Sequence, residues 1–151
     1  MKDLEKVLKE TTELSEKMGK ILSNSKYYEY EDLSGLNIDY GNNEELFLLE
    51  ELKNILYKVE DIKQNIDYLN RPITCIGKLS KNTSGRYEMY NNSDKIEFTS
   101  GNRIEALIYD DNYEIERWVK TSVEHDGNGY YLVGYKDVNM EGLLVRIRFA
   151  L

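Results

Sequence analysis

The sequence predicts an α+β protein in which an antiparallel, coiled-coil-like helical hairpin precedes a small β-barrel of the SH3-like or OB-like kind. Two observations carry this prediction. Apolar residues repeat with heptad spacing in two stretches before Pro72, the only proline of the chain. After Pro72 the apolar residues alternate with a period of two, and turn residues interrupt them at short intervals. We therefore expect a helical domain at residues 1–72 and a β-barrel domain at residues 73–151.

Each helical stretch carries one apolar seam with spacings of three and four residues. The first seam consists of Leu4, Val7, Thr11, Leu14, Met18 and Ile21, and the second of Leu48, Leu52, Ile55, Val59, Ile62, Ile66 and Leu69. Asn42 or Asn43 is placed to cap the second helix, and Pro72 is placed to end it. Since neither helix buries its seam alone, the two pair within one chain, pack on the barrel, or form a homodimer through the heptad seams.

Residues 25–43, which we call the tyrosine-rich segment, form an acidic linker between the two helices. The segment is longer than the usual helix–helix connection, and loops of that length tend to be functional or disordered. Its Tyr27, Tyr28, Tyr30 and Tyr40 are interleaved with acids, a composition that suits a surface for a partner protein or a cationic ligand. The alternative is a linker whose tyrosines cover the hairpin.

The C-terminal half predicts short strands at residues 73–79, 86–90, 95–98, 103–109, 113–124, 130–135 and 143–149. The turn Asn82-Thr83-Ser84-Gly85 is expected to join the first two strands as a hairpin. Trp118 alternates with charged and polar neighbours along the longest strand, so we expect its ring in or against the barrel core.

Charge and composition narrow the classes of function. The formal net charge is −8, with 16 acidic and 10 basic residues before Ile73, so bulk binding to nucleic acid is disfavoured. The first residues lack the apolar core of a signal peptide, and no window is apolar enough for a membrane span. The single cysteine, Cys75, excludes an internal disulfide and fits a reducing compartment. We expect a cytoplasmic protein.

Catalytic and metal-binding patterns are weak. Cys75 and His125 are the one conceivable nucleophile–base pair, but they are fifty residues apart, and Cys75 reads as a core residue. Asp126-Gly127-Asn128-Gly129 is a hairpin turn rather than a calcium loop, because it lacks the twelve-residue spacing and the terminal glutamate. We expect His125 to shape this turn and to pack on a neighbouring ring. No enzymatic activity, cofactor or metal site is expected.

Arginines and aromatic residues of the C-terminal half make the best candidate ligand site. The candidate residues are Arg86, Tyr87, Trp118, Tyr130, Tyr131, Arg146 and Arg148. Arg146 and Arg148 point to one face of a strand, while Val145, Ile147 and Phe149 point to the other. Two adjacent guanidiniums suit a phosphate-bearing small ligand, and an aromatic ring suits a nucleobase. The alternative is a solvated face whose arginines pair with Glu88, Glu97 or Glu116.

The C-terminal half contains a series of short motifs, namely Gly77-Lys78-Leu79, Gly85-Arg86-Tyr87-Glu88, Thr99-Ser100-Gly101, Ile104-Glu105, Trp118, Val123-Glu124-His125-Asp126-Gly127, Gly129-Tyr130-Tyr131-Leu132-Val133-Gly134, Glu141-Gly142-Leu143 and Val145-Arg146-Ile147-Arg148. In these motifs it resembles an uncharacterised family of small β-domains of Firmicutes and their phages and mobile elements. This resemblance implies a small β-domain of bacterial or phage origin and no particular activity.

We therefore expect a non-enzymatic binding protein that occupies a partner protein, with interference in a host defence system suggested by the phage resemblance alone. The alternative function is a nucleotide or small-ligand binder that uses the arginine–aromatic face. The acidic, tyrosine-rich helical half favours the protein partner, and the arginine pair favours the small ligand.

Overall fold

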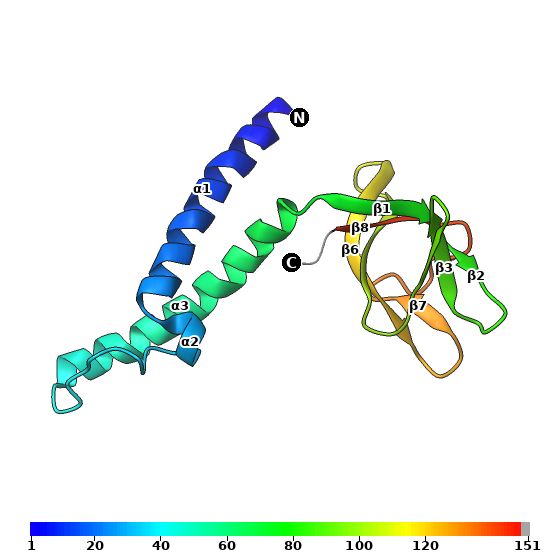
Figure 1. The fold of residues 1–151 in the computed structure, drawn as a ribbon. Coiled ribbons are helices and arrows are strands. Elements are labelled where there is room, and N and C mark those ends of the chain that lie inside the picture. The colour runs from blue at the N-terminus through cyan, green and yellow to red at the C-terminus, as the bar shows by residue number, and fades with distance from the viewer. Residues whose placement is uncertain (149–151) are drawn as a thin grey trace. The chain divides into compact units, whose positions relative to one another are not determined.

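The computed structural model describes residues 1–148 and divides the chain into two compact units, Met1–Asn70 and Arg71–Leu151. The helices α1, α2 and α3 belong to the first unit and the strands β1 to β8 to the second (Figure 1), so the predicted α+β class is confirmed. The helices are α1 (Lys2–Asn24), α2 (Tyr27–Tyr30) and α3 (Asn43–Leu69). The strands are β1 (Ile73–Lys78), β2 (Ser80–Lys81), β3 (Tyr87–Asn91), β4 (Asp94–Glu97), β5 (Arg103–Asp110), β6 (Ile115–His125), β7 (Tyr130–Leu132) and β8 (Leu144–Arg148).

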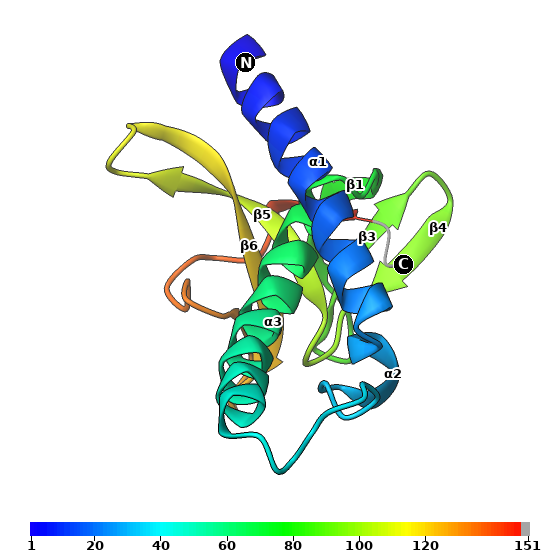
Figure 2. The same cartoon turned by 90° about the vertical axis from the view of Figure 1, so that its left-hand side faces the viewer.

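Helices α1 and α3 lie side by side as an antiparallel hairpin (Figure 2). Their direction follows from the cross-helix hydrogen bonds, because Ser15 near the middle of α1 donates to Asp67 near the end of α3 at 2.7 Å. Asn42 caps α3 as predicted, since its side-chain oxygen accepts from the backbone amides of Glu44 and Glu45. The predicted helical hairpin is therefore present in the first unit.

The predicted apolar seam supplies only part of the line along which the two helices touch, namely Ile66, which is buried, and Val59, which packs against the cluster around Leu22 and Leu56. Helix α1 turns Ser15 and Leu22 inward, and both are buried. Gly19, between them, leaves room for the stem of Lys63 on α3. Lys63 in turn reaches Asp67 at 2.7 Å, so the inter-helix contact is partly polar. The small residues Ser15 and Gly19 permit a close approach that the larger seam residues would prevent, and this explains the difference.

Most of the predicted seam is exposed. On α1, the residues Leu4, Val7, Leu14 and Ile21 are exposed, as are Leu48, Leu52, Ile55, Ile62 and Leu69 on α3. Their exposed fractions run from 44% to 71%, which is high for large apolar side chains in heptad spacing. We call these nine side chains the apolar face.

The tyrosine-rich segment folds back onto the helices. It contains the single turn of α2, and Tyr27 and Leu33 from it are buried with Leu22 of α1 and Leu56 of α3. Tyr27 fits here because Lys26 adopts a left-handed backbone conformation, with φ of 59°, which redirects the chain between α1 and α2. The segment is thus anchored at one end by a small apolar cluster.

The strands form two antiparallel sheets, with the orders β1-β8-β5-β6-β7 and β2-β3-β4. The predicted hairpin between the first two strands is wrong, because β1 pairs with β8 and the turn at residues 82–85 joins β2 to β3. The chain leaves the larger sheet at Leu79, whose amide donates to the carbonyl of Leu143 and whose carbonyl accepts from Gly142. The Leu79 side chain is also fully buried. These contacts hold Leu79 against the segment before β8, and β1 ends at the residue before it, Lys78.

The inward faces of the strands supply one apolar core. Its buried members are Leu79, Met89, Phe98, Ile104, Ala106, Ile108, Val119, Val123, Leu132, Met140 and Val145. Cys75 packs against this core, as its alternation predicts. The last predicted strand extends to Phe149, which lies outside the described residues, whereas β8 is described from Leu144 to Arg148. This unit therefore has a core of its own, with one face of the larger sheet turned away from it.

Candidate functional site

The tyrosine-rich segment exposes three of its four tyrosines. Tyr28, Tyr30 and Tyr40 have exposed fractions of 52%, 49% and 63%. Tyr27 is buried, so its prediction as an interface residue is wrong, and it instead covers the hairpin. Burial, followed by the nearby Glu60, raises the pKa of the Tyr27 phenol. Three exposed rings beside acidic residues leave a surface suited to a partner that carries positive charge.

A hollow of about 230 Å³ opens between the tyrosine-rich segment and α3, and we call it the Tyr40 hollow. It is lined by Asp32, Leu33, Ser34, Tyr40, Leu49, Glu50 and Lys53. Hydrogen bonds from the side chain and the backbone amide of Ser34 hold the pKa of Asp32 below its usual value, so this carboxylate is ionised at neutral pH. Glu50 is a second carboxylate of the lining, 3.8 Å from Lys53. The hollow thus offers an aromatic ring and two carboxylates at one place.

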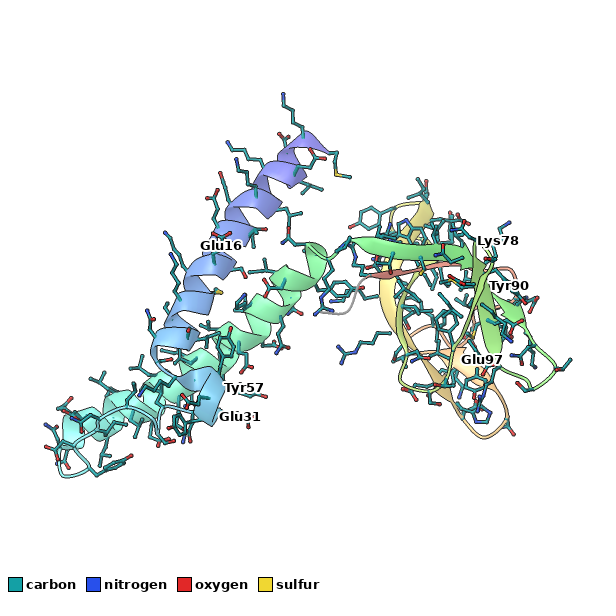
Figure 3. The ribbon with its side chains drawn as sticks, in the orientation of Figure 1. Glu16, Glu31, Tyr57, Lys78, Tyr90 and Glu97 are labelled. Atoms are coloured by element: carbon teal, nitrogen blue, oxygen red, sulfur yellow. The ribbon has the colours of Figure 1, made fainter. Side chains whose placement is uncertain are left out.

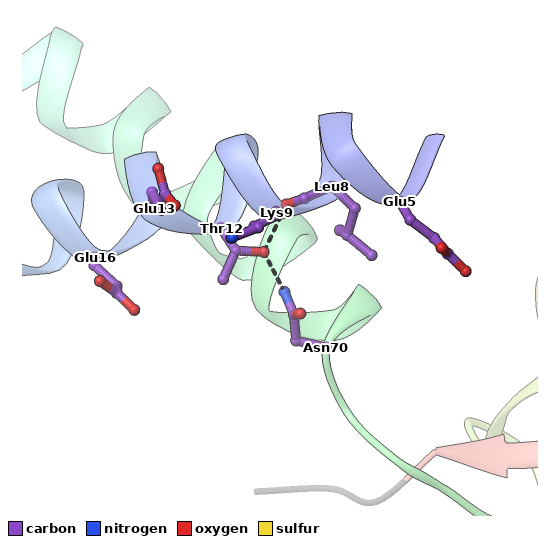
Figure 4. A pocket seen from close by; sticks show the side chains of 7 residues that line it. All are labelled: Glu5, Leu8, Lys9, Thr12, Glu13, Glu16 and Asn70. Carbon is purple, nitrogen blue, oxygen red and sulfur yellow. Dashed lines mark hydrogen bonds between the residues drawn. The ribbon is translucent and has the colours of Figure 1, made fainter. Parts of the chain in front are cut away.

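A second, larger hollow of about 410 Å³ runs along α1 and the end of α3. Its lining consists of Glu5, Leu8, Lys9, Thr12, Glu13, Glu16 and Asn70 (Figure 4). The Asn70 amide donates to the Thr12 hydroxyl at 2.9 Å, and that hydroxyl donates to the carbonyl of Leu8 at 2.8 Å. The bond from Asn70 joins the end of α3 to α1, whereas the bond to Leu8 lies within α1, so the polar groups at the base of this hollow stabilise the hairpin itself.

Trp118, Arg146 and Arg148 lie together on the outer face of the larger sheet, but a buried carboxylate holds the arginines. Glu105 of β5 is only 4% exposed. Arg146 Nε donates to Glu105 Oε1 at 2.7 Å, and Arg148 Nε donates to Glu105 Oε2. A phosphate would have to displace this carboxylate to reach the guanidiniums, so the geometry weighs against a phosphate-bearing ligand here.

Glu105 is the partner of Arg146 and Arg148 that the sequence did not reveal. The expected partners of the arginines were Glu88, Glu97 and Glu116, whereas Glu105 stands directly opposite Arg146 in the sheet. In the sequence Glu105 stands between the apolar residues Ile104 and Ala106. This position indicates a buried carboxylate, and a buried carboxylate requires cationic partners.

Trp118 does not lie in the core. Val119 takes the inward position of β6 opposite Ala106, so its neighbour Trp118 points to the other face opposite Leu107. There the Arg146 guanidinium carbon is 4.1 Å from the centroid of the half-buried ring. The indole face is thus already covered by a cation.

The other candidate ligand residues are not part of this group. Arg86, just before β3, pairs at 2.9 Å with Glu97, the last residue of β4, whose side chain is labelled in Figure 3. Tyr87 and Tyr130 pack against the core, whereas Lys136 lies 5.1 Å from the ring of Tyr131. The seven predicted residues therefore do not form one site. Trp118, Arg146 and Arg148 come together, and Arg86 lies beside Tyr130, since Glu97 and then Tyr130 raise the pKa of the Arg86 guanidinium.

The predicted turn around His125 is confirmed. The Nδ1 atom of His125 accepts from the amide of Gly127 at 3.0 Å, and its ring lies edge-on to Tyr130 with centroids 4.7 Å apart. The Asp126 carboxylate accepts from the amides of Asn128 and Gly129. These bonds lower the pKa of Asp126. Within residues 1–148 no three His, Cys, Asp or Glu side chains cluster as a metal site would require.

Comparison with known protein families gives a match in the C-terminal half. The model of a family described as a domain of unknown function (DUF5348) matches residues 77–147, which run from the end of β1 to β8. The resemblance of the C-terminal half to an uncharacterised domain family is confirmed to this extent. No curated protein and no solved structure matches the chain. In the part of the chain that the structure describes, no helix has the length and apolar character needed to cross a bilayer.

Proposed function

We propose that this is a non-enzymatic binding protein whose tyrosine-rich segment receives a basic side chain of a partner protein. The observation that carries the proposal is the Tyr40 hollow, where a tyrosine ring and the carboxylates of Asp32 and Glu50 line one small space. Lys53 of the same lining lies 3.8 Å from Glu50, so the two carboxylates outnumber this cation and leave one negative charge for a partner. The hollow, at about 230 Å³, is smaller than the cavities that usually hold small-molecule ligands. It suits a single lysine or arginine side chain presented by a protein.

The charge of the helical half supports a basic partner. With 16 acidic and 10 basic residues before Ile73, this half attracts cationic surfaces and speeds their encounter. Exposed Tyr28 and Tyr30 add amphipathic contact area of the kind that is enriched at protein interfaces. The attraction is expected to weaken as salt is added, because most of these charges are exposed.

In this proposal the β domain is closed as a small barrel of the SH3-like or OB-like kind. It serves as a stable domain to which the binding, helical half is attached. The resemblance to domains of Firmicutes and their phages suggests a partner in the cytoplasm of a bacterial host. A protein of a host defence system is the candidate that a phage origin would favour. Each of these points follows from the resemblance and not from the geometry of the hollow.

Peptide binding tests the proposal. The probe is a panel of fluorescently labelled peptides that combine arginine or lysine with leucine, titrated with the full chain and followed by polarisation. Tyr40→Ser and Glu50→Gln are expected to weaken binding about tenfold each, a loss in the range of cation–π and charge contacts. Glu51→Gln removes the same charge from the same helix outside the hollow and is expected to change binding little.

Two results would overturn the proposal. One is the absence of binding to any basic peptide at low salt. The other is an equal effect of Glu50→Gln and Glu51→Gln, since that would assign the attraction to net charge alone and not to the Tyr40 hollow.

A further inference from the structure

Strand β6 is paired along only part of one of its two edges. It pairs with β5 over residues 115–122, but with β7 only over residues 123–125. The amide of Val133 extends the second contact to the carbonyl of Ser122. Over residues 115–121, which we call the open edge, β6 has β5 on one side and, among residues 1–148, no strand on the other. This stretch belongs to the hairpin of β5 and β6 whose connected ends project from the sheet (Figure 2).

The backbone groups of alternate residues point out of the open edge. Val123 bonds to the residues just before β5, whereas the carbonyl of Ser122 accepts from the β7 side. The bonding direction alternates along an antiparallel strand, and the register of β6 with β5 is continuous. Glu116 and Trp118 therefore direct their amide and carbonyl groups out of the open edge. Such a row of groups is a template for one further strand.

We propose that the open edge pairs with the open edge of a second copy of this chain, as antiparallel strands related by a twofold axis at Trp118. Trp118 is the middle residue of the open edge, so this axis aligns the two edges over their whole length. In this register Trp118 lies opposite Trp118 of the second copy, and Glu116 lies opposite Lys120 of the second copy. Both copies use the same surface, as a twofold contact requires.

The charges of the open edge are complementary to themselves in this register. Glu116 and Lys120 are exposed, and strand alternation places both side chains on the outer face with Trp118. An acid directly opposite a base stabilises a strand pair, and the twofold axis forms this pair twice. A shift of the register by two residues would lose both pairs. Lys120 also stands opposite Glu105 within its own sheet, so in the dimer it lies between two carboxylates.

Trp118 lies at the centre of the contact. Arg146 reaches the half-buried ring from β8, on the far side of β5, and its guanidinium carbon is 4.1 Å from the ring centroid. The opposite side of the ring is thus directed toward the open edge, where opposed aromatic side chains pack favourably. Because each copy contributes only one short strand, the dimer is of the transient kind, with a dissociation constant on the order of 10–100 μM.

The mass of the full chain in solution tests the proposal. Sedimentation is expected to give 17.8 kDa at about 1 μM and a mass approaching twice that value at about 1 mM. Over the same range the Trp118 amide is expected to exchange with solvent more slowly as the concentration rises. The Val119 amide points toward β5, so its exchange is expected to stay the same.

Reversal of charge tests the register. Glu116→Lys sets two lysines opposite each other on both sides of the axis and is expected to weaken the dimer about tenfold. Lys120→Glu is expected to do the same with two acids. An equal mixture of the two variants restores both acid–base pairs and is expected to associate as well as the unmodified chain. The control is Glu124→Lys, which makes the same change where β7 already pairs with β6. It is expected to leave the dissociation constant within about twofold.

Three results would overturn the proposal. One is a mass of 17.8 kDa for the unmodified chain at every concentration. Another is an equal effect of Glu116→Lys and Glu124→Lys, since the contact would then depend on net charge or lie elsewhere. The third is a mixture of the two folded variants that does not associate. Far-UV circular dichroism shows whether each variant is folded. If Lys120→Glu is not, the comparison of Glu116→Lys with Glu124→Lys decides the question.

Discussion

Replacing Glu105 with glutamine is expected to destabilise the β domain strongly. Glu105 is buried, and its two oxygens accept from Arg146 and Arg148. Arg148 also donates to the carbonyl of Arg71, which ties the start of this unit to β8. Glutamine keeps the size of the side chain and removes only the charge, so the variant takes the charge of Glu105 away from two poorly exposed guanidiniums.

The magnitude follows from the burial of the three side chains. Removing one partner of a buried ion pair costs about 3–5 kcal/mol. The arginine side chains retain 17% and 16% of their exposure, so some water reaches them and the lower end of this range applies. A loss of about 3 kcal/mol lowers the urea midpoint by roughly 1.5 M, if the denaturant slope is about 2 kcal/mol per molar. Trp118 is the only tryptophan, and its fluorescence follows the unfolding of the β domain alone.

Two further variants test whether the loss of stability in Glu105→Gln comes from the buried charges. Glu97→Gln breaks the more exposed pair with Arg86 and is expected to leave the midpoint almost unchanged. Replacing Glu105, Arg146 and Arg148 together with apolar residues of similar size is expected to recover most of the lost stability. If Glu105→Gln lowers the midpoint no more than Glu97→Gln, the arginines are solvated and the reasoning about this face is refuted.

Two more outcomes are expected. Trp118→Ala is expected to cost about 1–2 kcal/mol in urea unfolding followed by near-UV circular dichroism, because the half-buried ring carries Arg146 on one face. A cost above about 3 kcal/mol would indicate a core position instead. For Tyr27, burial raises the folded-state pKa above that of the unfolded chain, so the stability it contributes is complete below about pH 10 and is lost as pH rises through the folded value. Tyr27→Phe removes that loss, and alkaline unfolding curves of variant and unmodified chain that fall in parallel would contradict this assignment.

Local sequence patterns predicted the helices, strands and turns well, because these elements depend on interactions between residues that are close in the chain. The heptad spacing predicted both long helices, and Asn42 predicted the start of α3 because its side chain satisfies amides that the helix leaves open. The turn residues at 126–129 predicted the hairpin of β6 and β7. The pairing of β1 was predicted wrongly, since a turn signal at residues 82–85 does not reveal that β8, far along the chain, competes for the same edge.

The candidate site was predicted only in part, for a related reason. Composition singled out the tyrosine-rich segment, yet it gave no means to separate buried Tyr27 from exposed Tyr28, because that depends on where α2 meets Leu56. Arg146 and Arg148 were correctly placed on one face by strand alternation. Their anion could be found only from the cross-strand register, which sets Glu105 opposite Arg146.

The sequence by itself determined the two-part α+β organisation, the heptad helices, the short strands and the turns, since each depends on neighbours within a few residues. The tertiary structure decided which side of each helix meets the other, which strands share an edge, and which charges are buried together. These depend on the packing of side chains that are far apart in the chain. Ser15 and Gly19 permit a closer approach than Leu14 and Ile21, and that difference in size leaves the apolar face exposed.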